Sequence, residues 1–356
     1  MRILITGICG FVGSRLAEAL IERRPGIEIF GVDNLSRPGS QTSLPWLKRL
    51  GVSVFHGDLR LASDLESLPS ADWVVDAAAT PSVLAGVDGK ISSRQLFEHN
   101  LIGSCQLLEF CKARKAGLIL LSSSRVYSIP ALARLPLVVE NRAYRLDLSQ
   151  PLSTGVSEHG IGPAFSTQPP ISLYGSSKLA SEIIALEYGA SFGFPVWIDR
   201  CGVLAGAGQF GTPDQGIFAY WINAHLRRAP LRYIGFGGLG HQIRDLFHPR
   251  DLAALALSQM DSNRADGRRV YTAGGGPGSC LSLAQLTAWC EARFGRHEPA
   301  SDPGARPFDV PWVVMDNREA RADFDWSPAM RAEEILEEIA VHAGDHPDWL
   351  ALSQAL

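Results

Sequence analysis

A glycine-rich turn directly after the first apolar run constrains the fold of this chain more than any other feature. Gly7, Gly10 and Gly13 follow the run Arg2–Thr6 and open an amphipathic stretch, Phe11–Arg23. In a strand–turn–helix unit the first glycine permits the tight turn, the second lets the backbone approach a pyrophosphate, and the third allows close helix–strand packing. The free N–H groups at the helix N-terminus then face the phosphates. The spacing predicts a dinucleotide-binding unit.

An acidic residue at the end of the second expected strand indicates which dinucleotide binds. Asp33 lies 20 residues after Gly13, where a carboxylate can accept both hydroxyl groups of the adenosine ribose and repel a 2′-phosphate. NAD is therefore expected rather than NADP, although an arginine at Arg37 could also reach a phosphate. Asp58, after the third strand, is either a ligand of the adenine amino group or a simple turn aspartate. Further candidate cofactor contacts are Phe11, Val12, Asn34, Leu59, Ala77 and Ala78.

Strand-like and helix-like segments alternate over the first 125 residues, which is typical of βαβ units and a parallel sheet. Short apolar runs bounded by turns suit strands that are covered on both faces. A long irregular segment rich in Pro, Ser and Gly follows at about 129–171, and loops of that length are usually functional. The expected strands of this half are residues 2–6, 27–32, 52–56, 73–78, 118–122 and 196–200, and the expected helices include 11–23, 94–112 and 174–190.

Beyond residue 200 the expected elements are shorter. The whole pattern predicts an α/β chain with a Rossmann-type, doubly wound parallel sheet over residues 1–200. A smaller C-terminal α/β lobe over residues 201–356 is expected to bind the substrate, with possible return segments to the core. The expected helices of this half are 216–228, 250–260, 283–293 and 332–342, and the expected strands are 231–234, 242–247 and 270–272.

Charge and cysteine usage exclude several classes of function. A net charge of −4 argues against a nucleic-acid-binding protein, which usually carries a basic patch. No uncharged apolar run approaches the ~20 residues of a membrane span, and the N-terminus leaves no room for a signal peptide, so a cytoplasmic protein without a membrane partner is expected. The six cysteines include no CxxC pair, and Gly344 interrupts the pair His342 and His346, so no metal site is expected.

A serine-rich strand end and a later Tyr–Lys pair form the candidate catalytic group. Ser122, Ser123 and Ser124 close the fifth strand, and Tyr174 and Lys178 lie four residues apart on one face of a helix. The lysine ammonium can lower the phenol pKa from about 10 towards neutrality. The phenolate is then a general base for an alcohol, and a serine hydroxyl that faces it can orient the same alcohol.

The order of these motifs resembles the extended short-chain dehydrogenases/reductases, the NAD-dependent epimerases and dehydratases of nucleotide sugars. The resemblance covers nearly the whole chain, including residues 242–245 and 325–328 in its second half. Further stretches are similar to one branch of that family, the CDP-paratose (CDP-tyvelose) 2-epimerases. These stretches are residues 33–37, 46–47, 56–60, 209–210 and 214–216.

The resemblance implies roles for individual residues. Ser123 matches the catalytic serine or threonine of the family, Tyr174 its base, and Lys178 the partner of that base. Asn100 matches an asparagine that helps hold the fifth strand near the active site, and Arg200 lies at a strand end beside the nicotinamide. The implied cofactor contacts therefore also include Asn100, Ser122, Tyr174, Lys178 and Arg200. The implied substrate contacts are Ser124, Arg125, Cys201, Gln209, Asp214, Gln215 and Arg244.

Three of these substrate contacts differ in how well their chemistry supports the role. The Arg244 guanidinium suits a diphosphate because it can bind oxygens in bidentate fashion. For Asp214 and Gln215, packing within the second lobe is an equal alternative.

Three departures from the family pattern change the expectation. Ser124 and Arg125 stand where family dehydratases carry Asp-Glu, so dehydration is disfavoured. Ile8 replaces a glycine of the usual turn, but the three functional glycines remain. The segment between Tyr127 and Tyr174 is longer than in most relatives, and since it is expected to border the active site, it leaves the usual substrate in question.

The expected function is a metal-free nucleotide-sugar epimerase with tightly held NAD. Tyr174 takes a hydroxyl proton, a transient keto sugar forms, and returning hydride inverts the centre. The alternatives are an NAD-dependent nucleotide-sugar dehydrogenase or reductase, a decarboxylase or a UDP-sugar 4-epimerase of the same fold, and a non-catalytic NAD(H)-binding protein. A homodimer is expected through the helices at 94–112 and 174–190, as is common in relatives.

Overall fold

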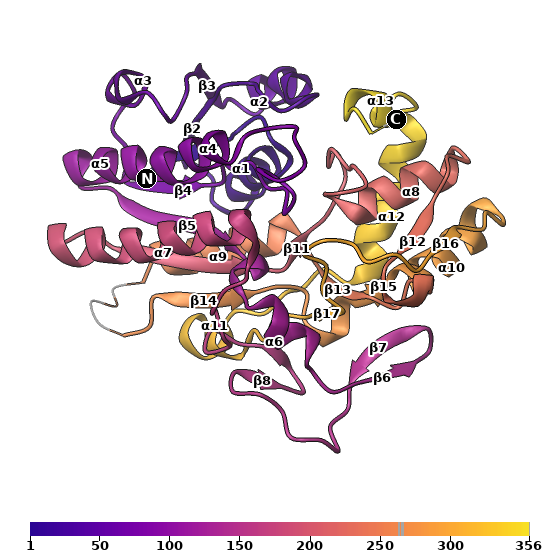
Figure 1. Cartoon of the computed structure of the whole chain (residues 1–356). Coiled ribbons are helices and arrows are strands. Elements are labelled where there is room, and N and C mark those ends of the chain that lie inside the picture. Colours follow the sequence, from indigo (N-terminus) through magenta and orange to yellow (C-terminus); the bar gives the residue numbers. More distant parts are fainter. Residues whose placement is uncertain (263, 265–266, 356) are drawn as a thin grey trace.

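The centre of the molecule is a parallel sheet with helices on both faces (Figure 1); the computed structural model describes residues 1–262, 264 and 267–355. Within these residues the sheet has seven strands in the order β14-β10-β5-β4-β1-β2-β3, and neighbouring strands are parallel. The chain builds outward through β2 and β3 and then crosses back to β4 beside β1, as in a doubly wound sheet. The strands are β1 (Arg2–Thr6), β2 (Glu28–Asp33), β3 (Ser53–His56), β4 (Trp73–Asp76), β5 (Gly117–Ser123), β10 (Val196–Cys201) and β14 (Val270–Ala273).

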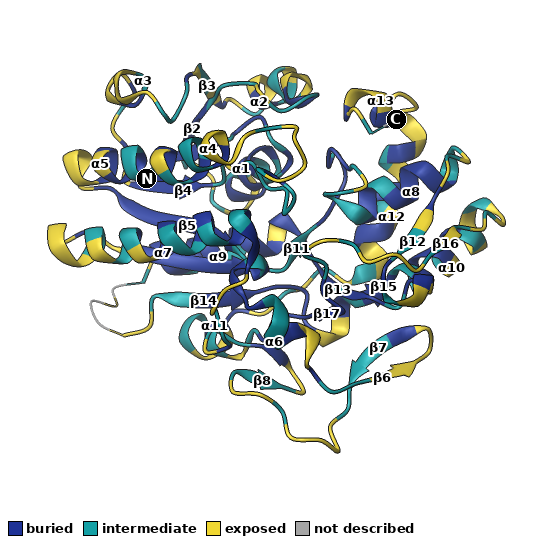
Figure 2. Cartoon of the chain, in the orientation of Figure 1, coloured by how far each residue is buried: buried dark blue, intermediate teal, exposed yellow. Residues whose placement is uncertain are grey.

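The strands are aliphatic because both faces of the sheet are covered. Ile3 and Ile5 pack into the layer of α1 (Phe11–Arg23) and α9 (Pro249–Met260), whereas Leu4 packs into the layer of α5 (Gly103–Arg114) and α7 (Ser172–Phe192). Successive side chains of a strand point to opposite faces. All three side chains are fully buried, and most of the sheet is dark blue in Figure 2.

The helix expected over residues 94–112 is divided. α4 (Ser93–Phe97) is followed by a π-helical turn, η2 (Glu98–Ile102), before α5 begins. The side chain of Asn100 in this turn bonds to Thr80 and Ser177. Turns of this type are frequent at functional sites, and this one directs a polar side chain at the segment after β4. The remaining short helices of this half are α2 (Leu44–Arg49) and α3 (Ala62–Glu66).

Three elements from the second half of the sequence, β14, α9 and α11 (Arg318–Phe324), pack in the core around the first sheet. β14 pairs with β10 in parallel register, with Ile198 opposite Val270. α9 packs against α1 and contributes Leu252 and Leu255 to the same apolar cluster. The chain therefore returns to the first sheet after residue 200.

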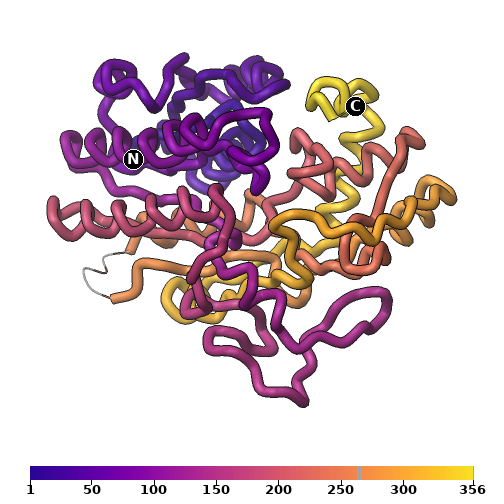
Figure 3. Tube along the Cα trace, viewed as in Figure 1, coloured from indigo at the N-terminus to yellow at the C-terminus, as the bar shows by residue number. Residues whose placement is uncertain are grey.

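The second lobe packs helices against a small mixed sheet in which β13 is central. β13 pairs with β11 and β17 in parallel and with β15 antiparallel. The C-terminal helices, yellow in Figure 3, run back to this lobe and contact α8. No helix among the described residues is long and apolar enough to cross a membrane. The elements of the lobe are β11 (Val203–Leu204), α8 (Ile217–Leu226), β12 (Arg232–Ile234), β13 (Ile243–Phe247), β15 (Cys280–Ser282), α10 (Leu283–Phe294), β16 (Ala300–Asp302), β17 (Trp312–Val313), α12 (Ala332–Asp345) and α13 (Trp349–Leu352).

The segment at 129–171 forms a short helix and two small hairpins. They are α6 (Ile129–Ala133), β6 (Leu137–Glu140) with β7 (Ala143–Leu146), and β8 (Val156–Ser157) with β9 (Gly160–Ile161). The segment packs on the second lobe, where the Ile161 N–H donates to the Val314 carbonyl at 2.8 Å and the Ser282 hydroxyl donates to the Arg142 carbonyl at 2.6 Å. It lies at the bottom of the molecule in Figure 1.

Asp199, buried in β10, makes the stability of the fold depend on pH. Burial raises its pKa from 3.8 to about 7, and its carboxyl group accepts one hydrogen bond, from the Gln259 amide at 2.7 Å, among the described residues. Because the folded pKa lies above the unfolded one, the contribution of Asp199 to stability is complete below about pH 3.8 and is lost as the pH rises through 7. Asp199→Asn should therefore melt at a higher temperature than the parent at pH 8, with a much smaller gain at pH 5. Calorimetry at both pH values checks this, and an equal difference at the two would contradict it.

Candidate active site

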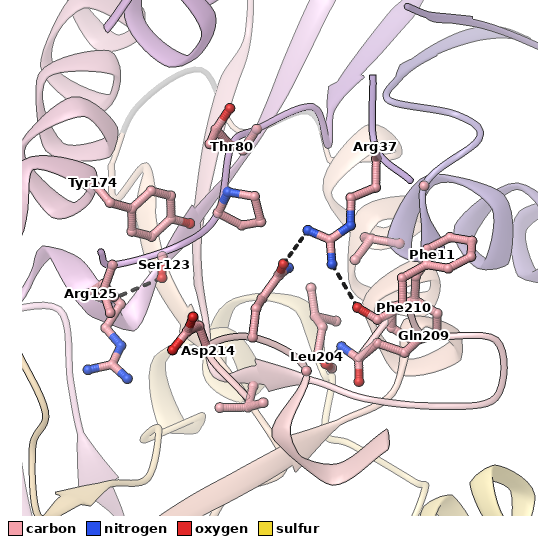
Figure 4. A pocket seen from close by; sticks show the side chains of 18 of the residues that line it. Phe11, Arg37, Thr80, Ser123, Arg125, Tyr174, Leu204, Gln209, Phe210 and Asp214 are labelled. Carbon is pink, nitrogen blue, oxygen red and sulfur yellow. Dashed lines mark hydrogen bonds between the residues drawn. The ribbon is translucent and has the colours of Figure 1, made fainter. Parts of the chain in front are cut away.

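A cavity of about 650 Å³ lies at the carboxyl ends of the parallel strands, between the sheet and the second lobe (Figure 4). Doubly wound sheets bind ligands at this edge, where the strand order changes direction. The cavity wall includes the glycine turn after β1, the ends of β2, β4 and β5, the start of α7, and the segment that leads into α8.

The glycine turn adopts the close geometry that its spacing predicts. Gly7 has a φ of +61°, which favours glycine, and a side chain at Gly13 would overlap the Gly7 carbonyl. Ile8, which replaces a family glycine, is fully buried and fills the space beside Gly31 in β2. The departure at Ile8 is therefore compensated by a glycine on the next strand. The N-terminus of α1 remains open to the cavity.

Asp33 is held at the edge of this turn. Its carboxylate accepts the backbone N–H of Cys9 at 2.9 Å and that of Leu35 at 2.8 Å, and it lines the cavity. Burial raises its pKa, and these two backbone hydrogen bonds oppose the rise. A carboxylate fixed here can accept hydrogen bonds from the hydroxyl groups of a ribose, and it repels a phosphate.

Asp58 also lines the cavity, but it carries an internal partner that the sequence did not indicate. The Arg60 guanidinium donates to both carboxylate oxygens, at 2.9 and 2.6 Å, and the Asn34 amide lies at 3.2 Å. These bonds, Arg60 first, hold the pKa of Asp58 well below its usual range. Asp58 is therefore a paired, ionised carboxylate in the cavity wall.

Arg37 reaches across the cavity instead of standing free for a phosphate. Its guanidinium donates to the Gln215 side chain at 2.5 Å and to the Phe210 carbonyl at 2.7 Å (Figure 4). Both residues belong to the segment 205–216, which we call the cover segment. Trp349 of α13, which does not line the cavity, also holds this segment: its indole N–H donates to the Gln209 carbonyl at 2.8 Å. Arg37 thus links the end of β2, on the glycine-turn side of the cavity, to the cover segment on the other side.

Tyr174 and Ser123 meet in the middle of the cavity. Tyr174 lies in the first turn of α7, Ser123 ends β5, and their side chains lie close together in the cavity (Figure 4). The Ser123 hydroxyl oxygen also accepts the Arg125 backbone N–H at 3.2 Å. Lys178, one helical turn after Tyr174, is buried and lines the same wall. The structure therefore brings the three predicted catalytic side chains to one cavity.

The pKa of Tyr174 differs from the sequence-based expectation. Burial raises it, whereas the nearby Ser123 hydroxyl and the charge of Arg125 lower it by less. The expected lowering towards neutrality is therefore wrong for this structure, because a phenolate loses its hydration at a site where the tyrosine is only 7% exposed.

Three arginines line the opposite end of the cavity, and we call them the arginine cluster: Arg125, Arg244 and Arg306. Arg244 pairs with Asp309 at 2.8 Å, and Arg306 pairs with Asp214 at 3.0 Å. Arg306 was missed by the sequence analysis, since it lies in an irregular loop with no recognisable pattern. Its only signal is a lone arginine in a Gly/Pro-rich stretch.

Most of the predicted site residues line this cavity. These are Gly7, Gly10, Phe11, Val12, Asp33, Asn34, Arg37, Asp58, Leu59, Ala77, Ala78, Ser122, Ser123, Ser124, Arg125, Tyr174, Lys178, Cys201, Gln209, Asp214, Gln215 and Arg244. The hydroxyl of Ser122, however, donates to Glu182 and is not directed at a ligand. Additional lining residues that the sequence did not indicate include Thr80, His99, Trp221, Arg232 and Phe308.

Two predicted cofactor contacts lie outside the cavity wall. Arg200 turns its side chain into the protein, where it binds Glu182 of α7 at 2.7 Å and the Pro163 carbonyl at 3.0 Å. Asn100 accepts the Thr80 N–H at 2.8 Å and so supports the cavity wall from behind. Both were expected to contact the cofactor directly, and this expectation is corrected. Each side chain is hydrogen-bonded to buried protein groups and supports the cavity wall instead.

The segment at 129–171 also departs from expectation. All of its residues are described, and none of them lines the main cavity. Its apolar side chains, such as Phe165 and Ile161, pack instead with Trp312 and Met315. The segment packs against β15 and β17 of the second lobe. The prediction that it borders the active site is therefore wrong.

Comparison with known proteins identifies the family. Residues 3–274 match the NAD dependent epimerase/dehydratase family. The chain is 27% identical over 348 residues to CDP-paratose 2-epimerase of Salmonella typhi, which covers 95% of this chain and 98% of that protein. It is 24% identical over 340 residues to UDP-glucose 4-epimerase of Corynebacterium glutamicum, covering 92% and 91%.

A solved structure shares the fold. The UDP-glucuronic acid 4-epimerase of Bacillus cereus, in complex with UDP-glucuronic acid and NAD, superimposes with a TM-score of 0.77 at 24% identity, covering 97% of this chain and 99% of that one. Together with the glycine turn and the Ser–Tyr–Lys group, the family match over most of its length shows that this chain belongs to the NAD dependent epimerase/dehydratase family.

Proposed function

We propose that this protein is an NAD-dependent epimerase that inverts one carbon of a nucleotide sugar through a transient keto intermediate. The observation that carries the proposal is the position of the Tyr174–Ser123 pair, between a dinucleotide-type glycine turn and the arginine cluster. A sugar held there lies between a cofactor bound at the glycine turn and a diphosphate bound at the arginine cluster. Because the keto intermediate is reduced again in the same site, no net redox change occurs.

Each residue of the catalytic group has a defined task in this proposal. Tyr174 takes the proton of the sugar hydroxyl, and Ser123 orients that hydroxyl. Lys178 supplies positive charge beside the phenol and a donor for a ribose hydroxyl. When bound, NAD supplies hydride acceptance and return; the glycine turn and Asp33 would hold its pyrophosphate and ribose.

The substrate end supports a nucleoside diphosphate sugar. Arg244 and Arg306 line this end, each fixed by a carboxylate, and their remaining N–H groups can donate to phosphate oxygens. Ser124 and Arg125 leave no Asp-Glu pair for removing water, which disfavours a dehydratase. The similarity to CDP-paratose 2-epimerase over nearly the full length makes inversion at C2 of a CDP-sugar the preferred form of the reaction.

Inversion at C4 of a UDP-sugar is the second candidate, favoured by the similarity to UDP-glucose 4-epimerases.

Two measurements on the purified protein with CDP-, UDP- and dTDP-sugars separate these reactions. Proton NMR follows the configuration of the sugar, and absorbance at 340 nm follows the formation of NADH. A new epimer without absorbance at 340 nm supports an epimerase and names the carbon. A stoichiometric rise at 340 nm with a released keto sugar would instead assign a dehydrogenase.

The link through Arg37 is expected to retain the cofactor. In Arg37→Gln, two charge-assisted hydrogen bonds to the cover segment are lost, so bound NAD should exchange with radiolabelled NAD about 10-fold faster than in the parent. Arg49→Gln removes an exposed arginine of α2 and serves as the matched control. If Arg37→Gln exchanged NAD at the parent rate, the cover segment would not control cofactor release.

We also propose that the protein is a cytoplasmic homodimer formed through the α5 and α7 face. α5 and α7 lie side by side, and the exposed residue Ile183 of α7 is an apolar side chain with 57% of its surface free. Ile183→Glu should convert a dimer to a monomer in light scattering after size exclusion, because a charge does not bury in such a contact. A monomeric parent protein would contradict the proposal.

A further inference from the structure

Arg306, the arginine that the sequence did not indicate, is held by the cover segment. It lies between β16 and β17 in a stretch without helix or strand, so no regular backbone fixes its long side chain. Its Nη2 group donates to the Asp214 carboxylate at 3.0 Å and to the Pro213 carbonyl at 2.9 Å. These are the only hydrogen bonds of its guanidinium within the part of the chain that the structure describes. The Nε and Nη1 groups therefore keep their N–H donors, in a side chain that lines the cavity and is 24% exposed.

Asp214 lies in a closed turn of the cover segment. The Thr212 N–H donates to the Gln215 carbonyl at 2.7 Å, and the Gln215 N–H donates to the Thr212 carbonyl at 3.2 Å. Gly216 follows with a φ of +69°, a conformation that favours glycine. Because two hydrogen bonds close this turn, Asp214 and Gln215 are held in a fixed position relative to each other.

These two neighbouring residues bind arginines from opposite sides of the cavity. Asp214 accepts from Arg306 of the second lobe, and the Gln215 side chain accepts from Arg37, at the end of β2, at 2.5 Å. Figure 4 shows Asp214 on the side where Arg125 lies and Arg37 at a distance from it. One peptide unit of the cover segment therefore connects an arginine of the core to an arginine of the second lobe.

A carboxylate beside an arginine cluster can act on a diphosphate in two opposite ways. It lowers the positive charge that attracts the diphosphate, or it fixes a guanidinium in the orientation that the diphosphate needs. The contacts favour the second action, because Asp214 and the Pro213 carbonyl share one nitrogen of Arg306 and leave the other two nitrogens for a ligand. The charge of Asp214 is also balanced from outside by Lys90, at 3.4 Å, whose side chain is 73% exposed.

We infer that Asp214 is a positioning residue for the diphosphate of the substrate. It holds Arg306 through Nη2, so that the Nε and Nη1 donors are directed at phosphate oxygens, and Arg37 anchors the same turn to the core. The inference rests on the proposed function, in which the substrate is a nucleoside diphosphate sugar. Binding of the diphosphate therefore depends on both anchors of the turn, and Asp214 acts through Arg306 instead of touching the substrate itself.

The test is a calorimetric titration of the protein with CDP and with UDP, with NAD in excess so that the glycine turn stays occupied. Asp214→Ala removes the acceptor of Arg306 and should weaken binding by about 10-fold, although it also removes a negative charge near an anion. Asp214→Asn keeps an oxygen acceptor at the same place and should recover most of the loss. Cytidine and uridine carry no phosphate and should bind the parent and both variants alike, which separates a lost phosphate contact from general damage to the cavity.

A second arm of the titration tests the anchor at Arg37. Arg37→Gln should weaken CDP or UDP binding by about threefold, although Arg37 lies on the glycine-turn side of the cavity. The double variant Arg37→Gln with Asp214→Ala should bind no more weakly than Asp214→Ala alone, because both residues act through one turn. Losses that multiply in the double variant would contradict the link through the turn.

Lys90→Gln is the matched control, because it removes the other cation beside Asp214 and should change the affinity by less than about twofold. Equal or tighter binding of CDP and UDP to a folded Asp214→Ala protein would overturn the inference and make Asp214 a competitor of the diphosphate. A parent protein that binds neither nucleotide would overturn the inference together with the diphosphate part of the proposed function. The titration needs no turnover, so a failed epimerase assay would leave its result intact.

Discussion

Tyr174→Phe should lower kcat by about 10³-fold while NAD remains bound. The substitution removes only the phenolic oxygen, which the proposed mechanism uses as the general base, and general base catalysis is worth about 10²–10⁴-fold. The ring stays in its buried position at the start of α7, so the cavity keeps its shape. Steady-state kinetics with the substrate found in the nucleotide-sugar screen, and mass spectrometry of the bound cofactor, measure the two effects separately.

Tyr127→Phe is the matched control for this loss. Tyr127 is also buried, and its hydroxyl donates to the Gly162 carbonyl at 3.0 Å, but it does not line the cavity. Its replacement should change kcat by less than about threefold, since it costs one hydrogen bond away from the chemistry. Full activity in Tyr174→Phe would remove Tyr174 from the mechanism.

Glu182→Ala should destabilise the protein by about 3–5 kcal/mol, the usual cost of leaving one partner of a buried ion pair alone. Glu182 is 2% exposed and accepts three hydrogen bonds from Arg200, with a further one from Ser122. Because these bonds tie α7 to β5 and β10, the variant should also lose activity through misplacement of Tyr174. Denaturant unfolding followed by circular dichroism measures the stability.

Two variants separate the buried pair from general effects of removing a glutamate. Glu109→Ala removes an exposed carboxylate of α5 that bonds to Lys112 and Tyr188, and it should cost less than about 1 kcal/mol. The double variant Glu182→Leu with Arg200→Met should recover much of the loss, because it removes both buried charges. A stability loss in Glu182→Ala no larger than in Glu109→Ala would show that the pair is not structural.

The features that sequence predicted well are those fixed by local spacing. The glycine turn, the aspartate at the end of β2 and the Tyr–Lys pair each act within one strand–turn–helix unit or one helical turn. Their positions in space follow once the element type is known. The parallel sheet was predictable for the same reason, since buried strands have a composition that differs from that of the helices covering them.

The features that sequence missed depend on contacts between distant segments. Arg37 is 178 residues from Gln215, and its role as a link follows only from the fold. Arg200 lies at the predicted strand end, but its side chain points away from the cavity because Glu182 is there to bind it. Arg306 enters the site on an irregular loop that carries no periodic signal.

The segment at 129–171 shows a further limit. Its position between two catalytic motifs suggested that it borders the site. Its apolar residues, however, complete a separate cluster with the second lobe, where Ile161 pairs with Val314 through the backbone. Adjacency in sequence did not determine which surface the segment covers.

In the proposed reaction, hydride leaves and returns to the same sugar carbon inside one site. This is tested with the identified nucleotide sugar carrying deuterium on the carbon that is inverted, mixed with unlabelled sugar in ordinary water. We expect an epimer that retains its deuterium at that carbon, with no exchange to unlabelled molecules and no accumulating absorbance at 340 nm. Loss of the deuterium to solvent would show inversion by proton removal at carbon and would rule out the return of hydride.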